Sequence, residues 1–310
     1  MNNIPTDIKS LLVNAYEALR QNNFSKGKTL LEKVLLVNPN IFEVNFNLGI
    51  IYLRTNKLDD SLICLQKAKK LKPNSPEVYF NLGVVFDKKK EYALSIENFT
   101  KNINLNPSNY VAYYNIGSLY QEIFEIKKAE KYLIKTIDLK PEYSAAYNNL
   151  FDLYDRSNQL DKYSNLLEKA QKYIKQKSLM DFYLGVHQYK KKNYQHAINI
   201  LENINFNEEN ITQNIKRFGI LAKSYDQISK FEKAFNNFKI NNDLVGKHEG
   251  KYIDNQVYIT YIKQRIEYFQ NFKISDWKNY PFKINSIDPI FLIGFPRSGT
   301  TLLDTILRTN

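Results

Sequence analysis

The chain has 310 residues, of which 23 are tyrosine and 19 are phenylalanine, and its formal net charge of +12 gives an isoelectric point of about 9.3. No apolar run is long enough to cross a bilayer and no secretory signal follows Met1, so we expect a soluble, cytoplasmic protein with no membrane partner. The single cysteine, Cys64, excludes an intramolecular disulfide, and the length favours two domains.

An interval of 34 residues is repeated along most of the chain. Small residues at the eighth and twentieth positions of each repeat allow two helices to approach closely, and proline at position thirty-two ends the second helix. The pattern predicts stacked helical hairpins and resembles the tetratricopeptide repeat. The residues that mark the interval are Pro39, Pro73, Pro107 and Pro141, together with Gly49, Gly83 and Gly117.

Later repeats depart from this pattern. In the fifth repeat, Phe151 and Tyr163 occupy both small-residue positions, so we expect its helices to pack differently. A sixth repeat contains Gly185, and a seventh, which contains Ala222, fits only if three residues are inserted. We therefore expect about seven tetratricopeptide repeats over residues 8–245.

The sixth position of four successive repeats is asparagine, which places one amide per repeat at the same angle on successive first helices. An amide can donate to a peptide carbonyl and accept from a peptide N–H, so a row of amides can hold an extended chain. The row resembles the asparagine ladder in the repeat region of O-linked N-acetylglucosamine transferases. The alternative is that asparagine is simply common at this position. The predicted peptide-binding residues are Asn47, Asn81, Asn115 and Asn149.

Neither the lysines nor the histidines predict a ligand of their own. Lysine triplets occur only at 88–90 and 190–192, where the repeat register places turns, so we expect solvated turns and no nucleic-acid partner. A basic rim that attracts acidic protein segments is the alternative. His187, His196 and His248 lack the spacing of a metal site, so we expect no metal and interpret them as surface residues.

Residues 246–286 are expected to form a capping helix and a connector. The stretch begins with a polar, glycine-bounded segment, which is typical of a domain boundary. Apolar residues then recur at helical spacing from Val257 to Phe269, which predicts a helix that covers the last repeat. The connector contains Trp277, which we expect to pack between the two units.

The last stretch, residues 287–310, carries a motif typical of enzyme chemistry. The apolar run 290–293 predicts a buried strand, and apolar residues at helical spacing over 302–307 predict a helix. The turn between them, 294–301, is bounded by glycine and ends where the free N–H groups of the helix point, which predicts an anion site. Its spacing is that of a phosphate-binding loop, except that Thr300 replaces the lysine that NTP hydrolysis requires.

The segment from Pro296 to Thr301 resembles the 5′-phosphosulfate loop of sulfotransferases, and it matches best those that carry tetratricopeptide repeats and the related tyrosylprotein sulfotransferases. The resemblance implies 3′-phosphoadenosine 5′-phosphosulfate as the donor substrate, held without a metal. It also implies that Arg297 is catalytic, because its charge would stabilise the sulfonyl group during transfer. The residues implied in donor binding are Arg297, Ser298, Gly299, Thr300 and Thr301.

The sequence as a whole predicts an all-α tetratricopeptide-repeat solenoid, followed by the first strand, loop and helix of an α/β P-loop-like sulfotransferase domain. By the resemblance, the acceptor-activating carboxylate and the 3′-phosphate site are expected beyond Asn310, so we expect a fragment or truncated product of a sulfotransferase. Its acceptor would be a hydroxyl, with protein tyrosine as one candidate, and its repeats would bind protein or peptide. The alternatives are a non-enzymatic scaffold for protein–protein interaction and a phosphotransferase with a variant loop.

Overall fold

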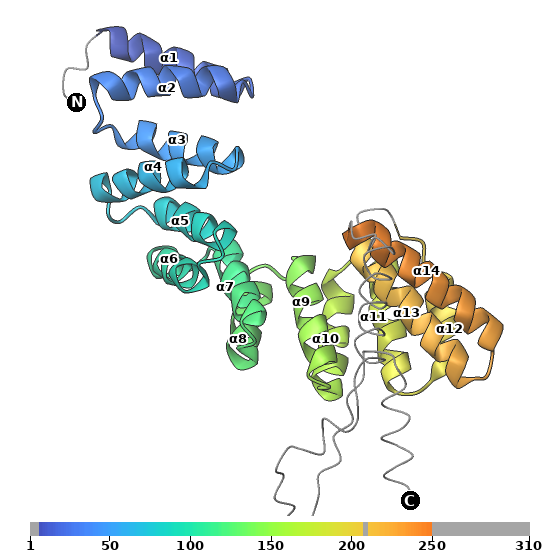
Figure 1. Cartoon of the computed structure of the whole chain (residues 1–310). Helices are drawn as coiled ribbons and strands as arrows, with labels where there is room; N and C mark the ends of the chain where they lie inside the picture. Colours follow the sequence, from blue (N-terminus) through green and yellow to red (C-terminus); the bar gives the residue numbers. More distant parts are fainter. Residues whose placement is uncertain (1–5, 207–209, 250–310) are drawn as a thin grey trace, which may run out of the picture. The chain divides into compact units, whose positions relative to one another are not determined.

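The computed structural model describes residues 6–206 and 210–249, and these residues form fourteen α-helices and no strand (Figure 1). The chain divides into two compact units, Met1–Val245 and Gly246–Asn310. The helices follow one another as hairpins, in which a first helix packs against the second helix that follows it.

The first helices of the hairpins are the odd-numbered ones: α1 (Thr6–Arg20), α3 (Phe42–Arg54), α5 (Pro76–Lys88), α7 (Tyr110–Glu122), α9 (Ser144–Arg156), α11 (Lys177–Lys190) and α13 (Ile211–Gln227). The second helices are α2 (Phe24–Val37), α4 (Leu58–Leu71), α6 (Tyr92–Leu105), α8 (Ile126–Leu139), α10 (Leu160–Tyr173), α12 (Tyr194–Glu202) and α14 (Phe231–Glu249). Each second helix from α2 to α8 ends before a repeated proline, because proline disfavours helical backbone in the residue that precedes it.

Each hairpin turns at one residue with a positive φ angle. Asparagine tolerates this left-handed conformation better than most residues, and it occupies three of these turns. The first six turn residues are spaced by 34 residues, whereas the seventh lies 37 residues after the sixth. The last hairpin therefore contains the three extra residues that its sequence register requires. The turn residues are Asn22, Asn56, Lys90, Phe124, Asn158, Lys192 and Ser229.

Glycine at the eighth repeat position allows the two helices of a hairpin to pack closely. A Cβ atom on Gly83 would lie 2.7 Å from the ring of Phe99 on the facing helix, which is closer than real Cβ contacts. In the same hairpin, the Ser95 hydroxyl at the twentieth position donates a 2.8 Å hydrogen bond to the Gly83 carbonyl. The small-residue positions of the sequence thus correspond to real close approaches between helices.

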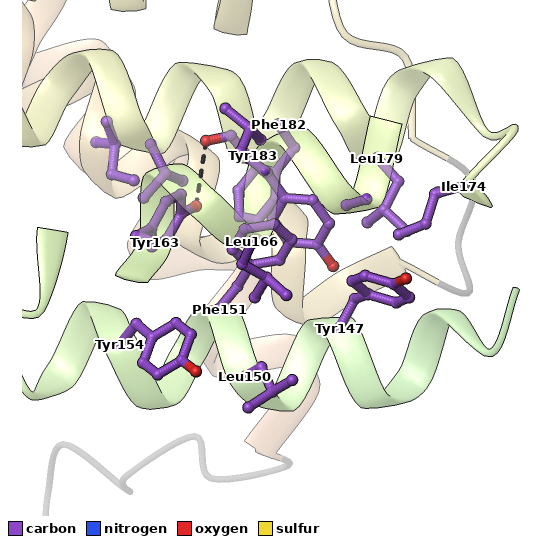
Figure 2. Close-up of a cluster of buried hydrophobic side chains, with 14 of the residues drawn as sticks. Tyr147, Leu150, Phe151, Tyr154, Tyr163, Leu166, Ile174, Leu179, Phe182 and Tyr183 are labelled. Carbon is purple, nitrogen blue, oxygen red and sulfur yellow. Dashed lines mark hydrogen bonds between the residues drawn. The ribbon is translucent and has the colours of Figure 1, made fainter. Parts of the chain in front are cut away.

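The fifth hairpin is built differently, as its sequence predicts. The rings of Phe151 on α9 and Tyr163 on α10 lie 4.7 Å apart, and Phe151 also stacks on Tyr183 of α11 at 3.9 Å between centroids. Figure 2 shows these rings inside a cluster of buried side chains that α9, α10 and α11 share. The bulky pair holds α9 and α10 apart, so they contact each other less extensively than α7 and α8 do.

Several expectations fall at or beyond the end of the described residues. The expected boundary segment at Gly246 continues helix α14, which runs to Glu249. The capping helix, the connector with Trp277, and the strand, loop and helix of residues 287–310 lie outside the residues that the structure describes. Within 6–206 and 210–249, no helix has the length and apolarity that a membrane span requires.

Candidate functional site

First helices of neighbouring hairpins contact each other at α3 and α5, α7 and α9, and α11 and α13, and we call the surface that the first helices present the first-helix face. Between α7 and α9, the Asn149 amide donates to the Ser118 hydroxyl at 2.9 Å. The Gln121 amide donates to Asp152 Oδ2 at 3.3 Å across the same pair of helices. These two polar contacts join α7 to α9 on this face.

The four predicted asparagines all lie half-buried on this face. The side-chain nitrogens of Asn47 and Asn81 each donate at 2.8 Å to a carbonyl of their own helix, those of Glu43 and Glu77. Asn149 instead bonds to the neighbouring helix. Because an amide nitrogen carries two hydrogens, the bonds of Asn81 and Asn149 each leave a second donor on the same group, whereas Asn47 makes a further hydrogen bond to Tyr16. Peptide binding by the four side chains stays a prediction.

The preceding first helix also contributes to the row. Tyr16 of α1 forms a hydrogen bond with the Asn47 side chain. Burial raises the pKa of Tyr16, and the hydrogen bond from Asn47 opposes this rise. Tyr16 and Ser118 hold the same ninth position of their repeats, so Asn47 and Asn149 each contact position nine of the hairpin before their own.

A pocket with a volume of about 410 Å³ opens on the first-helix face between α9, α11 and α13. Its floor is apolar and nearly fully buried. Figure 2 shows the four aromatic rings of the floor where α9, α10 and α11 meet. The floor residues are Phe151, Tyr163, Phe182, Tyr183 and Val186. The polar rim includes Asn148, Asp152, Arg156, Thr212, Gln213 and Lys216, and the predicted Asn149 also lines the pocket.

The charges at the rim are mutually paired. Arg156 Nε lies 2.8 Å from Asp152 Oδ2, and Lys216 Nζ lies 3.6 Å from Asp152 Oδ1. Lys216 also contacts Asp155 Oδ2 at 2.5 Å, while Lys190 contacts Asp155 Oδ1 at 2.7 Å. Burial alone would raise the pKa of Asp155, but the two lysines outweigh it and hold that pKa below its usual value. These ion pairs fix α9 against α11 and α13.

Two polar atoms of the pocket residues lack a hydrogen-bond partner among the described residues. Both the side-chain oxygen of Asn148 and the hydroxyl of Tyr183 are buried without one. A buried polar atom without a partner is unfavourable by about 1–3 kcal/mol, and both atoms are buried away from the open space of the pocket.

His187 is buried, which corrects the expectation that it lies at the surface. Only 6% of the residue is exposed, and its Nε2 lies 2.7 Å from the Ser164 hydroxyl. The imidazole stacks on Tyr163, and burial lowers its pKa, with a smaller contribution from the charge of Lys191. His196 is exposed, as expected. Within the described ranges, no group of three or more His, Cys, Asp or Glu side chains could hold a metal.

Sequence reasoning located the asparagine row but missed the pocket. The bulky pair Phe151 and Tyr163 indicated different packing, yet nothing in the repeat register linked it to Lys216, which comes from a later helix. The donor-binding residues predicted at 297–301 lie outside the described residues, and their role stays a prediction.

Comparison with family models identifies repeats in the middle of the chain. A model described as TPR repeat matches residues 51–90, and a model described as tetratricopeptide repeat matches residues 76–109 and 110–143. No curated protein sequence matches the chain.

Solved structures share the fold along most of the described region. A tetratricopeptide repeat protein from Parabacteroides merdae aligns with a TM-score of 0.57 at 15% identity, covering 82% of this chain and 97% of that one. The pilF protein of Pseudomonas aeruginosa aligns with a TM-score of 0.53 at 13% identity, covering 72% and 96%. MamA from Desulfovibrio magneticus aligns with a TM-score of 0.52 at 20% identity, covering 55% and 97%. With the repeat matches and the helical hairpins, these likenesses identify the described part of the chain as an all-helical tetratricopeptide-repeat solenoid.

Proposed function

We propose that this chain is a scaffold for protein–protein interaction, and that it binds an extended protein segment along the first-helix face. The observation that carries this proposal is the row of asparagine amides at one repeat position, in which Asn81 bonds to its own helix and retains a second N–H donor. Such groups can pair with the main chain of any extended segment, because every peptide unit offers one donor and one acceptor.

The spacing of the row favours an extended partner over a globular one. Successive asparagines come from successive hairpins, so they are regularly placed along the face and each can contact a different part of one chain. Main-chain recognition of this kind tolerates different side chains, whereas the pocket at α9, α11 and α13 can select one of them.

The proposal can be tested with a phage-displayed library of short random peptides selected against the full chain. The double variant Asn81→Ala, Asn115→Ala should bind the selected peptides at least several-fold more weakly, since each lost hydrogen bond contributes about 0.5–1.5 kcal/mol. A matched control is Asn165→Ala, Asn199→Ala, which removes two exposed asparagines from the second helices α10 and α12. Equal binding by both double variants would exclude the asparagine row as the peptide site.

We propose sulfonyl transfer as a second function, carried by a longer protein with a complete catalytic domain. It is supported by the match of Pro296 to Thr301 to the 5′-phosphosulfate loop of sulfotransferases, which is a feature of the sequence alone. The donor would be 3′-phosphoadenosine 5′-phosphosulfate, held by the loop amides and by Ser298, Gly299, Thr300 and Thr301. Arg297 would stabilise the charge that develops during transfer. The solenoid would then present the acceptor protein.

A further inference from the structure

Helix α8 presents a stripe of lysines to solvent. Lys127, Lys131 and Lys135 are exposed and follow one another at intervals of four residues, so they lie on one side of the helix, opposite its buried residues. We call these three residues the α8 basic stripe. No other described second helix has lysine at all three equivalent positions, and α4 and α10 have Asp59 and Asp161 at the first of them.

The carboxylates of α8 do not neutralise the stripe, because both pair with lysines of α10. Glu130 Oε1 lies 2.7 Å from Lys162 Nζ, and Asp138 Oδ1 lies 2.9 Å from Lys169 Nζ. Glu130 also accepts a hydrogen bond from the Tyr154 hydroxyl at 2.8 Å. Among the residues that the structure describes, no carboxylate forms an ion pair with a lysine of the stripe. Three positive charges on one side of α8 are therefore available to an acidic partner.

Two apolar side chains accompany the stripe and favour a polypeptide as the partner. Ile134, on the same side of α8, is 36% exposed, and Phe124, in the turn that precedes the helix, is 80% exposed. The phosphate backbone of a nucleic acid has no apolar group to cover these side chains. A protein segment can pair its carboxylates with the lysines and cover the apolar groups with its own apolar residues.

The stripe is one helix wide, which limits the shape of the partner. On α10, the helix that Glu130 and Asp138 contact, the carboxylates of Asp161 and Glu168 are exposed. An anionic lipid surface would lie against both helices and would be repelled by these carboxylates. A single acidic segment that follows α8 avoids them. The lysines are spaced by about 6 Å along the helix axis, which equals the spacing of carboxylates four residues apart on a partner helix.

We propose that the α8 basic stripe docks an acidic helix of a partner protein, with carboxylates at intervals of four residues against Lys127, Lys131 and Lys135 and an apolar side chain against Ile134. The stripe lies on a second helix, so it is a docking surface separate from the first-helix face. A scaffold with two such surfaces can bring two protein segments together.

The test uses the full chain and two labelled synthetic probes followed by fluorescence anisotropy at low salt. One is a helical peptide with glutamate at every fourth residue and leucine beside each glutamate, and the other has glutamine in place of every glutamate. The wild-type chain should bind the acidic peptide more tightly than the glutamine peptide, and added salt should weaken this binding because it screens exposed charges. The triple variant Lys127→Gln, Lys131→Gln, Lys135→Gln should lower the affinity for the acidic peptide by at least about threefold, the smallest loss expected for three exposed ion pairs.

A matched control separates the stripe from net charge. The triple variant Lys70→Gln, Lys172→Gln, Lys223→Gln removes three exposed lysines from α4, α10 and α13. Both triple variants lower the formal net charge of +12 by the same amount, and glutamine keeps the helix propensity of lysine, so both should fold. The control should bind the acidic peptide as the wild-type chain does. Equal losses of affinity in the two variants would reveal unspecific charge attraction and overturn the proposal.

A labelled single-stranded oligonucleotide and vesicles of anionic lipid test the other classes of acidic partner. If binding of either depends on the stripe while binding of the acidic peptide does not, the proposal is wrong. The asparagine-row variant Asn81→Ala, Asn115→Ala should bind the acidic peptide with normal affinity. The docking proposal and the proposed function therefore fail separately, because the library peptides test the asparagine row and the acidic peptide tests α8.

Discussion

The hydroxyl of Tyr163 donates a 3.1 Å hydrogen bond to the backbone carbonyl of Tyr183, and so joins the second helix of the fifth hairpin to the first helix of the sixth. Both side chains are almost fully buried, and both contact Phe151 between them. A position that holds a small residue in other hairpins has become a polar and aromatic link between two hairpins. The same link supports the floor of the pocket.

Replacing Tyr163 with phenylalanine should weaken this link without leaving a cavity. The ring remains, and only a buried hydrogen bond is lost, so the free energy of unfolding should fall by about 0.5–1.5 kcal/mol. Urea denaturation followed by circular dichroism measures the change. Tyr173→Phe is a suitable control because Tyr173 is 41% exposed, and its effect should be close to zero. Equal stability of the two variants would contradict a stabilising role for the hydrogen bond.

A second prediction concerns the glycine at the eighth repeat position. Gly83→Ala places a methyl group 2.7 Å from the Phe99 ring, which already packs edge-on against Phe80 and cannot easily move. Overpacking of this kind should lower the free energy of unfolding by about 1–3 kcal/mol.

Gly246 provides the matched control for this substitution. It lies in helix α14, and a Cβ atom added to it would have no neighbour within 4 Å, so Gly246→Ala should be neutral or raise helix stability by up to about 1 kcal/mol. Thermal melts of both variants provide the comparison. A melting temperature unchanged by Gly83→Ala would show that the two helices can separate at little cost.

The third prediction is a dependence of stability on pH that arises from His187. Burial lowers its pKa in the folded chain from the usual value of 6.5. Above pH 6.5 the imidazole is neutral in both states, so it contributes no dependence there. As the pH falls below 6.5, the unfolded chain binds the proton more readily, and the folded state becomes less stable until the pH passes below the folded pKa.

His187→Gln should remove this part of the acid destabilisation, whereas the exposed His196→Gln should retain it. The measurement is the free energy of unfolding of the three proteins in urea at neutral pH and at a series of pH values below 6.5. Parallel pH curves for the wild-type chain and His187→Gln would refute the assignment.

The fourth prediction concerns the sulfotransferase proposal and applies to a protein that continues this chain with a complete catalytic domain. Arg297→Ala should lower turnover by about 10²- to 10³-fold, because the guanidinium acts on charge that appears in the transition state. Donor affinity should fall much less, since the loop amides and hydroxyls still hold the ground state. Thr300→Ala should weaken donor binding at least as much as turnover. Turnover assays beside calorimetry of donor binding separate the two effects, and a reversed pattern would exchange the two roles.

The repeat architecture could be predicted from the sequence because its causes are local. Helices, turns and close approaches within one hairpin depend on residues near one another in the chain, such as Gly83 and Ser95, which the hydrogen bond between them brings together. The 34-residue interval therefore predicted the hairpins, and the bulky pair at Phe151 and Tyr163 predicted the exception.

Tertiary structure alone decided what the polar groups of the first-helix face contact. The repeat register gives Asn47 and Asn149 the same position, and each contacts the ninth position of the hairpin before it, but Asn47 also donates to a carbonyl of its own helix. Lys216 reaches Asp152 and Asp155 only because α13 packs beside the earlier first helices. The physical reason is that contacts between hairpins depend on how successive hairpins stack, and that stacking is set by the volumes of buried side chains rather than by the repeat interval.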